Sequence, residues 1–396
     1  MMYRSTRGGA EPLDFTAAMI HGLAPDGGLY VPEAIPVLPD GWTTWSYERA
    51  ISETLQMFGA DDVDGLVKEA ASQFHHPEIA PIVAVGDRLV LELFHGPTLS
   101  FKDHAMQVVV RLLSREVDHG VILGATSGDT GTAAIEASRG SDTLKVVILY
   151  PEGGVSDFQR RQMTTVDAPN VQAVAVRGTF DDCQRLVKEA FATHSHLLAI
   201  NSINWGRIAA QAGFHLQASA RVGAPHDVVI PSGNFGNVYS CWLAKQMGAP
   251  IETIVIANNA NHGLSDLVNT GRMPSATVVP TSAPSMDIQV PSNLERFTGD
   301  PKTEFRAGWS NDAQIAQTIA EVESAHGYRL DPHTATAWRA GVETKSDRPQ
   351  LVVATAHPAK FDDAVPPPDW FPSLAGLEEH QVTIDDDSSE LEDLIR

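Results

Sequence analysis

Short runs rich in Val, Ile and Leu alternate with helical patterns along most of the chain, and this alternation constrains the fold more than any other feature. The runs occupy residues 88–94, 120–126, 145–151, 171–178, 227–233, 252–258 and 350–356. Continuous apolar runs of this length are typical of strands buried on both faces of a sheet. Helical patterns separate several of them, at 102–117, 130–137, 180–192 and 237–247. The pattern predicts an α/β chain whose parallel sheets are connected by crossover helices.

The two ends of the chain differ from this alternating pattern of apolar runs and helical segments. Before residue 88, the turn-rich segment 22–32 is followed by helical patterns at 45–58 and 62–74. The acidic segment 376–396 keeps apolar residues at helical spacing, and residues 385–388 predict the capped start of a last helix. We expect this segment to be a solvated face and assign it no function.

Composition excludes several classes of protein. The 396 residues suffice for two or three packed units, and the net charge of −22 argues against a nucleic-acid partner. No apolar run reaches the roughly 18 residues of a membrane helix, and the first residues lack the apolar core of a secretory signal. Cys183 and Cys241 are far apart and without metal-ligand spacing. We therefore expect a cytoplasmic protein without a disulfide framework, membrane span or metal site.

Ligands of parallel sheets bind beyond the carboxyl ends of the strands, and Lys102 follows the first such end. After the turn at Gly96-Pro97, Ser100 is predicted to cap a helix whose first turn contains Lys102. The positive end of a helix disfavours an ammonium ion and lowers its pKa, as a Schiff-base lysine requires. The alternative is a lysine that extends into solvent.

Two glycine-containing loops lie in the same strand-to-helix context. Residues 124–131 and 231–237 both expose successive backbone N–H groups at a helix start, where a phosphate or carboxylate can bind. The loop at 124–131 is neither a Walker motif nor a GxGxxG fingerprint. Each can instead be a tight capped turn. Thr355 lies at the end of a late strand, where its hydroxyl either faces a ligand or simply satisfies a local partner.

These segments and several others together resemble the threonine synthases, fold-type II pyridoxal-phosphate (PLP) enzymes related to the tryptophan synthase β chain. The shared motifs are at residues 5–8, 22–32, 91–107, 125–131, 155–165, 201–211, 231–237, 284–297, 331–335 and 355–361. The resemblance implies a three-layer αβα fold with parallel-rich sheets. Two domains of this fold would enclose PLP, and an N-terminal α/β extension would precede them in the chain. We expect the extension at 1–90, a small PLP domain at 91–205 and a large one at 206–396.

The resemblance also implies roles for individual residues. Lys102 would carry PLP, and Thr355 would face its pyridine nitrogen. The cofactor phosphate would be held by Gly233, Asn234, Phe235, Gly236 and Asn237. The substrate carboxylate would bind at Thr126, Ser127, Gly128, Asp129 and Thr130. Candidates for the substrate phosphate are Arg161, Asn201, Ser202, Asn204 and Arg207, each of which can instead make interdomain hydrogen bonds.

The implied reaction converts O-phosphohomoserine and water to threonine and phosphate, in a monomer or homodimer whose partner is this small-molecule substrate and not a nucleic acid or a membrane. Glu152 and Gly154 stand where many relatives have basic residues, so a phosphate contact from that turn is not expected. His104 replaces a common apolar aromatic residue, and Asn237 a frequent Asp. Two alternatives stay open: another fold-type II lyase, such as a threonine or serine dehydratase, and a non-catalytic relative that binds a phosphorylated ligand.

Overall fold

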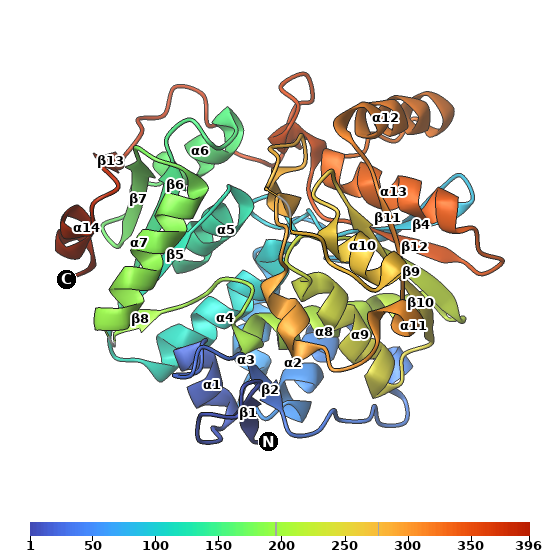
Figure 1. Cartoon of the computed structure of the whole chain (residues 1–396), viewed down its shortest axis with the longest axis horizontal. Coiled ribbons are helices and arrows are strands. Elements are labelled where there is room, and N and C mark those ends of the chain that lie inside the picture. Colours follow the sequence, from blue (N-terminus) through green and yellow to red (C-terminus); the bar gives the residue numbers. More distant parts are fainter. Residues whose placement is uncertain (195, 276) are drawn as a thin grey trace.

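The computed structural model describes residues 1–194, 196–275 and 277–396. Two parallel-rich sheets, each covered by helices, lie side by side, and the N-terminal elements lie below them in Figure 1. This arrangement is the αβα layering that the alternation of apolar runs and helical patterns predicts.

The first sheet has six strands in the order β11-β10-β9-β12-β4-β3. All neighbours are parallel except β3 and β4, which form an antiparallel pair at one edge. The strands are β3 (Ile82–Val85), β4 (Arg88–Glu92), β9 (His226–Pro231), β10 (Ile251–Asn258), β11 (Phe305–Trp309) and β12 (Gln350–Ala354). Its helices are α8 (Trp205–Val222), α9 (Gly236–Met247), α10 (Gly263–Thr270), α11 (Pro301–Glu304), α12 (Asp312–His326) and α13 (Pro332–Thr344).

The second sheet has five strands, all parallel, in the order β13-β7-β6-β5-β8. The strands are β5 (Gly120–Ala125), β6 (Leu144–Pro151), β7 (Val171–Val176), β8 (Leu197–Leu198) and β13 (Gln381–Ile384). Its helices are α4 (Lys102–Glu116), α5 (Asp129–Ser138), α6 (Asp157–Thr164), α7 (Phe180–Thr193) and α14 (Ser388–Ile395).

The N-terminal region contributes a small antiparallel pair and three helices. These elements are β1 (Tyr3–Ser5), α1 (Phe15–His21), β2 (Tyr30–Pro32), α2 (Tyr47–Met57) and α3 (Asp64–Ala71). Four 3₁₀ turns complete the described part of the chain: η1 (Trp42–Thr44), η2 (Pro284–Met286), η3 (Ser292–Arg296) and η4 (Pro358–Lys360).

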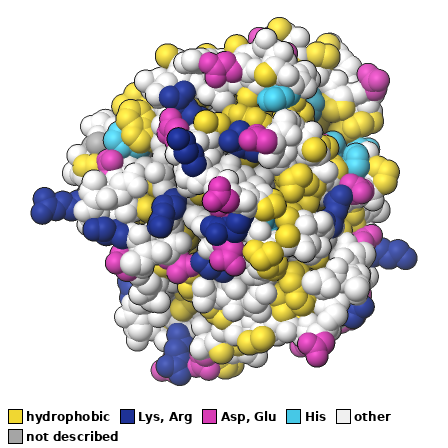
Figure 2. All heavy atoms as spheres, turned by 90° about the vertical axis from the view of Figure 1, so that its right-hand side faces the viewer, with side chains coloured by type: hydrophobic (Ala, Val, Ile, Leu, Met, Phe, Trp, Pro, Cys, Tyr) yellow, Lys and Arg dark blue, Asp and Glu magenta, His cyan; other side chains and the backbone are white. Residues whose placement is uncertain are grey.

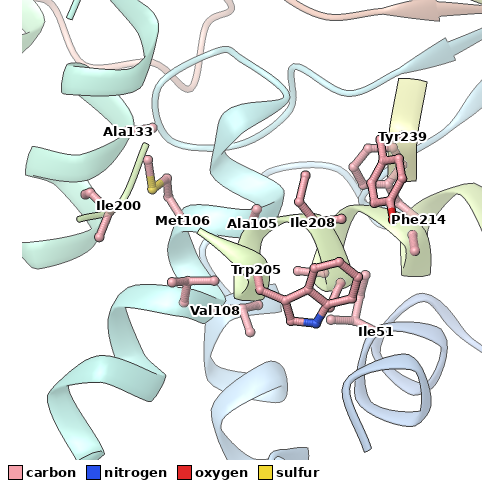
Figure 3. Packing of buried hydrophobic residues seen from close by; sticks show 14 of the residues in the cluster. Ile51, Ala105, Met106, Val108, Ala133, Ile200, Trp205, Ile208, Phe214 and Tyr239 are labelled. Carbon is pink, nitrogen blue, oxygen red and sulfur yellow. The ribbon is translucent and has the colours of Figure 1, made fainter. Parts of the chain in front are cut away.

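A continuous apolar core joins the N-terminal region to the helices between the sheets. Trp205 at the start of α8 is buried, and its ring centroid lies 5.3 Å from that of Tyr3 and 5.4 Å from that of Phe58. Figure 3 shows side chains of α2, α4, α8 and α9 meeting in this layer. The N-terminal region is therefore packed into the body of the protein, because its aromatic residues complete the core around Trp205.

The predicted apolar runs all contain strands, and the predicted helices differ from the observed ones only at their ends. The capped start of the last helix is also confirmed, with Asp387 as N-cap of α14. The edge strands β11 and β13 were not predicted because their sequences, FRAGW and QVTI, contain no continuous apolar run. The domain boundaries at 90 and 205 stay predictions. The topology adds that β4 joins the six-stranded sheet and that β13 returns to the five-stranded one.

Figure 2 shows basic and acidic side chains interspersed with apolar ones on the face turned toward the viewer, without one continuous basic area there. Within the described residues, no helix combines the length and the apolarity that crossing a bilayer requires.

Gly213 allows the close approach of α2 and α8. A Cβ atom there would lie 2.7 Å from Ile51 Cδ1 and 3.0 Å from Ile51 Cα. We expect Gly213→Ala to lower the free energy of unfolding by about 1–3 kcal/mol through overpacking. The matched control is Gly65→Ala on α3, where nothing lies within 4 Å of the added atom, and a change below about 1 kcal/mol is expected. Urea unfolding of both variants measures the difference, and equal stabilities would contradict the packing argument.

Candidate active site

The site begins where β4 and β12, which pair in parallel, reach the same edge of their sheet. Beyond the strands, the two chain segments stay together: Phe101 N donates to Thr355 O at 2.8 Å, and His357 N donates to Leu99 O at 3.0 Å. Ser100 and Ala356 form a β-bridge between these contacts. The segment that ends at Lys102 and the segment that contains Thr355 are therefore fixed to each other by backbone hydrogen bonds.

The predicted cap by Ser100 is wrong. Phe101 is the residue before α4, and no side chain caps that helix. The bridge to Ala356 keeps the backbone of Ser100 beside the other loop, so the helix begins one residue later and Lys102 is its first residue. The turn is held instead by the buried carboxyl of Asp103, which accepts from Thr98 N at 2.8 Å and Thr98 Oγ1 at 2.6 Å. Burial raises the pKa of Asp103 to about 7.

Lys102 is buried, with only 8% of its surface exposed, so the solvent-facing alternative is wrong. Its Nζ atom lies 3.3 Å from Asp129 Oδ2 and 3.5 Å from Ser285 Oγ. Burial lowers the pKa of the Lys102 ammonium, the positive charges of Arg207 and Lys360 lower it further, and Asp129 opposes them. An amine in this environment gives up its proton more readily than a surface lysine.

Asp129 contacts two lysines, each through a different carboxylate oxygen. Its Oδ1 atom lies 3.2 Å from Lys360 Nζ and accepts from Gln159 Nε2 at 2.8 Å. Burial by itself raises the pKa of the carboxyl, but the ammonium groups of Lys102 and Lys360 outweigh that effect and hold the pKa of Asp129 well below its usual range. The carboxylate is therefore ionised throughout the neutral pH range.

The loop around Asp129 is organised by Thr126, whose Oγ1 atom accepts from Gly128 N and from Gly131 N, both at 2.9 Å. Gly128 has φ +132°, and a Cβ there would lie 2.3 Å from Gln159 Nε2, so the close approach of Gln159 requires glycine. Because the first N–H groups of a helix have no intrahelical acceptor, those of Asp129 and Thr130 point outward from the start of α5.

The loop 231–237 leads into α9 through Phe235, which has the left-handed φ of 63°. A Cβ on Gly233 would lie 2.8 Å from Met286 Cα, so only glycine allows this backbone approach. Asn234 accepts from Ser292 N at 2.6 Å and donates to Ser202 Oγ. Backbone N–H groups at the start of α9 face the site as a cup for an anion.

Asn237 and Arg207 each carry a buried nitrogen without a partner among the described residues. Asn237 Oδ1 lies 2.7 Å from His215 Nε2, but its Nδ2 atom is unsatisfied. Arg207 donates from Nη1 to Ile200 O at 3.0 Å, while its Nε atom is unsatisfied. Burial lowers the pKa of Arg207 to about 10, so it stays a cation at neutral pH. Buried donors of this kind are costly unless a ligand accepts from them.

The other phosphate candidates are less available. Asn204 caps α8 through Gly206 N at 2.9 Å, and its Nδ2 atom donates to two backbone carbonyls. Arg161 lies on α6, where Nη1 donates to Glu379 Oε1 at 3.0 Å. Asn201 is exposed, and Ser202 is half-buried beside Asn234. Arg161 and Asn204 would have to exchange existing partners to reach a ligand.

Thr355 is buried, and its N–H group donates to Thr334 Oγ1 at 3.3 Å. Nearby, His333 Nδ1 lies 2.8 Å from Asp331 Oδ1, and its Nε2 atom accepts from Ser285 N at 3.2 Å. These contacts fix the tautomer with the proton on Nδ1. The sequence did not single out His333, Ser285 or Lys360 as site residues, although 284–297, 331–335 and 355–361 are the motifs that contain them.

The arrangement brings together a buried amine, an ionised carboxylate, two helix starts able to bind anions and a buried guanidinium. Such a site can attach a carbonyl cofactor to Lys102, bind a phosphorylated ligand and move protons near the lysine.

Comparison with known proteins agrees with this chemistry. Residues 83–356 match the family of pyridoxal-phosphate dependent enzymes, and residues 2–69 match the threonine synthase N terminus. The threonine synthase of Pseudomonas aeruginosa is 39% identical over 92% of this chain and 90% of that protein. The crystal structure of PLP-bound threonine synthase from Brucella melitensis has a TM-score of 0.93 and 38% identity, covering 100% of this chain and 98% of that one. Yeast threonine synthase gives a TM-score of 0.92 and 31% identity, with coverage of 100% and 98%. The chain belongs to the threonine synthase family of pyridoxal-phosphate-dependent enzymes, the family that its sequence motifs predicted.

Proposed function

We propose that this protein converts O-phosphohomoserine and water to L-threonine and inorganic phosphate, using PLP carried by Lys102. One observation carries the proposal: the buried amine of Lys102 faces the ionised Asp129, and the buried Arg207 is near enough to lower the pKa of that amine. The match to the threonine synthase N terminus favours this function over the other fold-type II lyases.

The residues present fit the cofactor. The unsatisfied Nδ2 atom of Asn237 and the glycine that is sterically required at 233 are what a phosphate cup at the start of α9 needs. Gly233, Asn234, Phe235, Gly236 and Asn237 would hold the cofactor phosphate. The hydroxyl of Thr355 would face the pyridine nitrogen and, being neutral, would leave that nitrogen largely unprotonated.

Bound PLP supplies an electron-withdrawing ring that acidifies the C–H bonds of an attached amino acid. The protein then has to move protons and hold charges. Once the substrate amine has displaced it, Lys102 would take one proton from the substrate Cα atom and one from Cβ, and protons would be delivered to Cγ, after phosphate has left it, and back to Cα. Backbone N–H groups of Asp129 and Thr130, with Ser127 and Gly128 beside them, would bind the α-carboxylate, and Thr126 would keep this loop in shape.

Arg207 is the first choice for the substrate phosphate, because its guanidinium is buried and has an unused donor. Ser202 and Asn201 would complete this contact, while Arg161 and Asn204 would join only after a change of partners. Loss of phosphate from Cγ and addition of water at Cβ give threonine.

We further propose that the enzyme is cytoplasmic, with both cysteines buried and free, and acts as a monomer or homodimer.

Purified protein loaded with PLP tests this function. O-phosphohomoserine should yield equal amounts of phosphate and threonine. Lys102→Ala should lower the rate on the order of 10³-fold or more, because the lysine both carries the cofactor and transfers protons, and should abolish the visible absorbance of the lysine-bound cofactor. The matched control Lys188→Met, on the exposed face of α7, should leave both unchanged. Phosphate without threonine, or activity only on free threonine or serine, would contradict the proposal.

Arg207→Met tests the phosphate site. Loss of a charge-assisted hydrogen bond, worth about 1.5–3 kcal/mol, should lower kcat/KM for O-phosphohomoserine about 10- to 150-fold and weaken competitive inhibition by inorganic phosphate. Binding of L-threonine, which lacks the phosphate, should weaken less. The control Arg272→Met removes an exposed guanidinium and should change neither constant. If threonine and phosphate lose affinity equally, Arg207 does not bind the phosphate.

A further inference from the structure

Lys360 is a buried lysine that the proposed mechanism does not use. It lies at the end of η4 with 1% of its surface exposed. Its Nζ atom donates to Thr98 O at 2.6 Å and to Gln162 Oε1 at 2.7 Å, and lies 3.2 Å from Asp129 Oδ1. An ammonium group has three N–H donors, and each of these has an acceptor. A buried cation of this kind is stable only when paired.

The three acceptors come from three parts of the site. Thr98 belongs to the turn before Lys102, Gln162 to α6, and Asp129 to the start of α5. The backbone of Lys360 adds a fourth link, since its carbonyl accepts from Ser156 Oγ at 2.9 Å. Lys360 therefore connects the segment after β12 to the helices of the five-stranded sheet.

Asp129 divides its two oxygens between the lysines. Oδ2 faces Lys102 Nζ at 3.3 Å and also lies 3.4 Å from Ser285 Oγ. Oδ1 faces Lys360 Nζ at 3.2 Å and Gln159 Nε2 at 2.8 Å. The contacts are separate, so Lys102 can leave Oδ2 without disturbing the pair at Oδ1.

The proposed reaction requires Lys102 to move away from Asp129 Oδ2. While Lys102 is bonded to the cofactor or exchanging protons with the substrate, it is not a free ammonium group beside Asp129. The other titratable or charged groups facing this cluster are Arg207 near Lys102 and His333 near Asp129, with Asp103 facing Lys360. Of the two lysines at Asp129, Lys360 is the one that can keep its contact while Lys102 is bonded to the cofactor or exchanges protons with the substrate. A buried carboxylate that loses its partner is costly.

We propose that Lys360 is a positioning residue of this active site: its ammonium group keeps the Asp129 carboxylate ionised and in place while Lys102 is engaged with the cofactor. The inference rests on the proposed role of Lys102 and deepens it. Lys360 touches neither the substrate nor the reacting atoms, and acts through the charge of Asp129.

A double-mutant cycle of Lys360→Met and Asp129→Asn tests this role in the full-length protein, with the dissociation constant of PLP as the readout. If Lys360 acts through the carboxylate, Lys360→Met should weaken PLP binding about tenfold or more when Asp129 is present, and much less when position 129 carries an amide, because contacting residues are not additive. The pH midpoint of the visible absorbance of the bound cofactor should also rise in Lys360→Met, since a cation near Lys102 is gone. Lys188→Met should change neither quantity.

Equal weakening in both backgrounds, or an unchanged absorbance midpoint, would overturn the proposal, because Lys360 would then act only through Thr98 and Gln162. If Lys360→Met does not fold, the proposal requires that Lys360→Met combined with Asp129→Asn regain a cooperative thermal transition. Failure of that double variant to fold would overturn it as well. The cycle uses PLP without substrate, so a protein that binds PLP but makes no threonine would contradict the proposed reaction and leave this test valid.

Discussion

The parallel pairing of β4 with β12 is the interaction on which the active site depends. These strands are far apart in the chain, yet they pair in register from Leu89 with Leu351 to Glu92 with Ala354. Because parallel strands end at the same edge of a sheet, the segments that follow them leave together and remain hydrogen-bonded as far as Phe101 and His357. A slip of one residue would turn every side chain of β4 to the opposite face. It would also separate the backbone contacts that hold Lys102 beside Thr355.

The charge inside the site is opposite to that of the whole chain. The net charge is −22, but the buried cluster contains three basic groups, Lys102, Arg207 and Lys360, around the single ionised carboxylate of Asp129. An excess of buried positive charge is unfavourable without anions. A cofactor and a substrate that each bring a phosphate would supply them, which would account for a cluster of cations at the centre of a protein that is acidic overall. Binding and charge neutralisation would then be one event.

The local parts of this site could be predicted from sequence, and the long-range parts could not. Lys102 and the two glycine loops follow apolar runs directly, so the rule for strand ends identifies them. The membership of β4 in the six-stranded sheet depends on pairing with residues some two-thirds of the chain away, which no local pattern encodes. The cap by Ser100 failed for the same reason, since the bridge to Ala356 decides the backbone there. A lysine in a short motif, such as Lys360, acquires its role only from the distant carboxylate that it meets.

The acidic C-terminal segment is mostly exposed, as expected, but it also makes contacts with the body of the protein. Glu379 pairs with Arg160 and Arg161 on α6 and accepts from Thr164 Oγ1 at 2.6 Å. Directly after it, β13 pairs in parallel with β7. The same helix provides Gln159 and Gln162, which bond to Asp129 and Lys360. The segment that begins at η4 therefore contacts α6 twice, through Lys360 and again through Glu379. Residues beyond the region that matches the PLP-dependent family, which ends at 356, therefore fix the helix that orients Asp129.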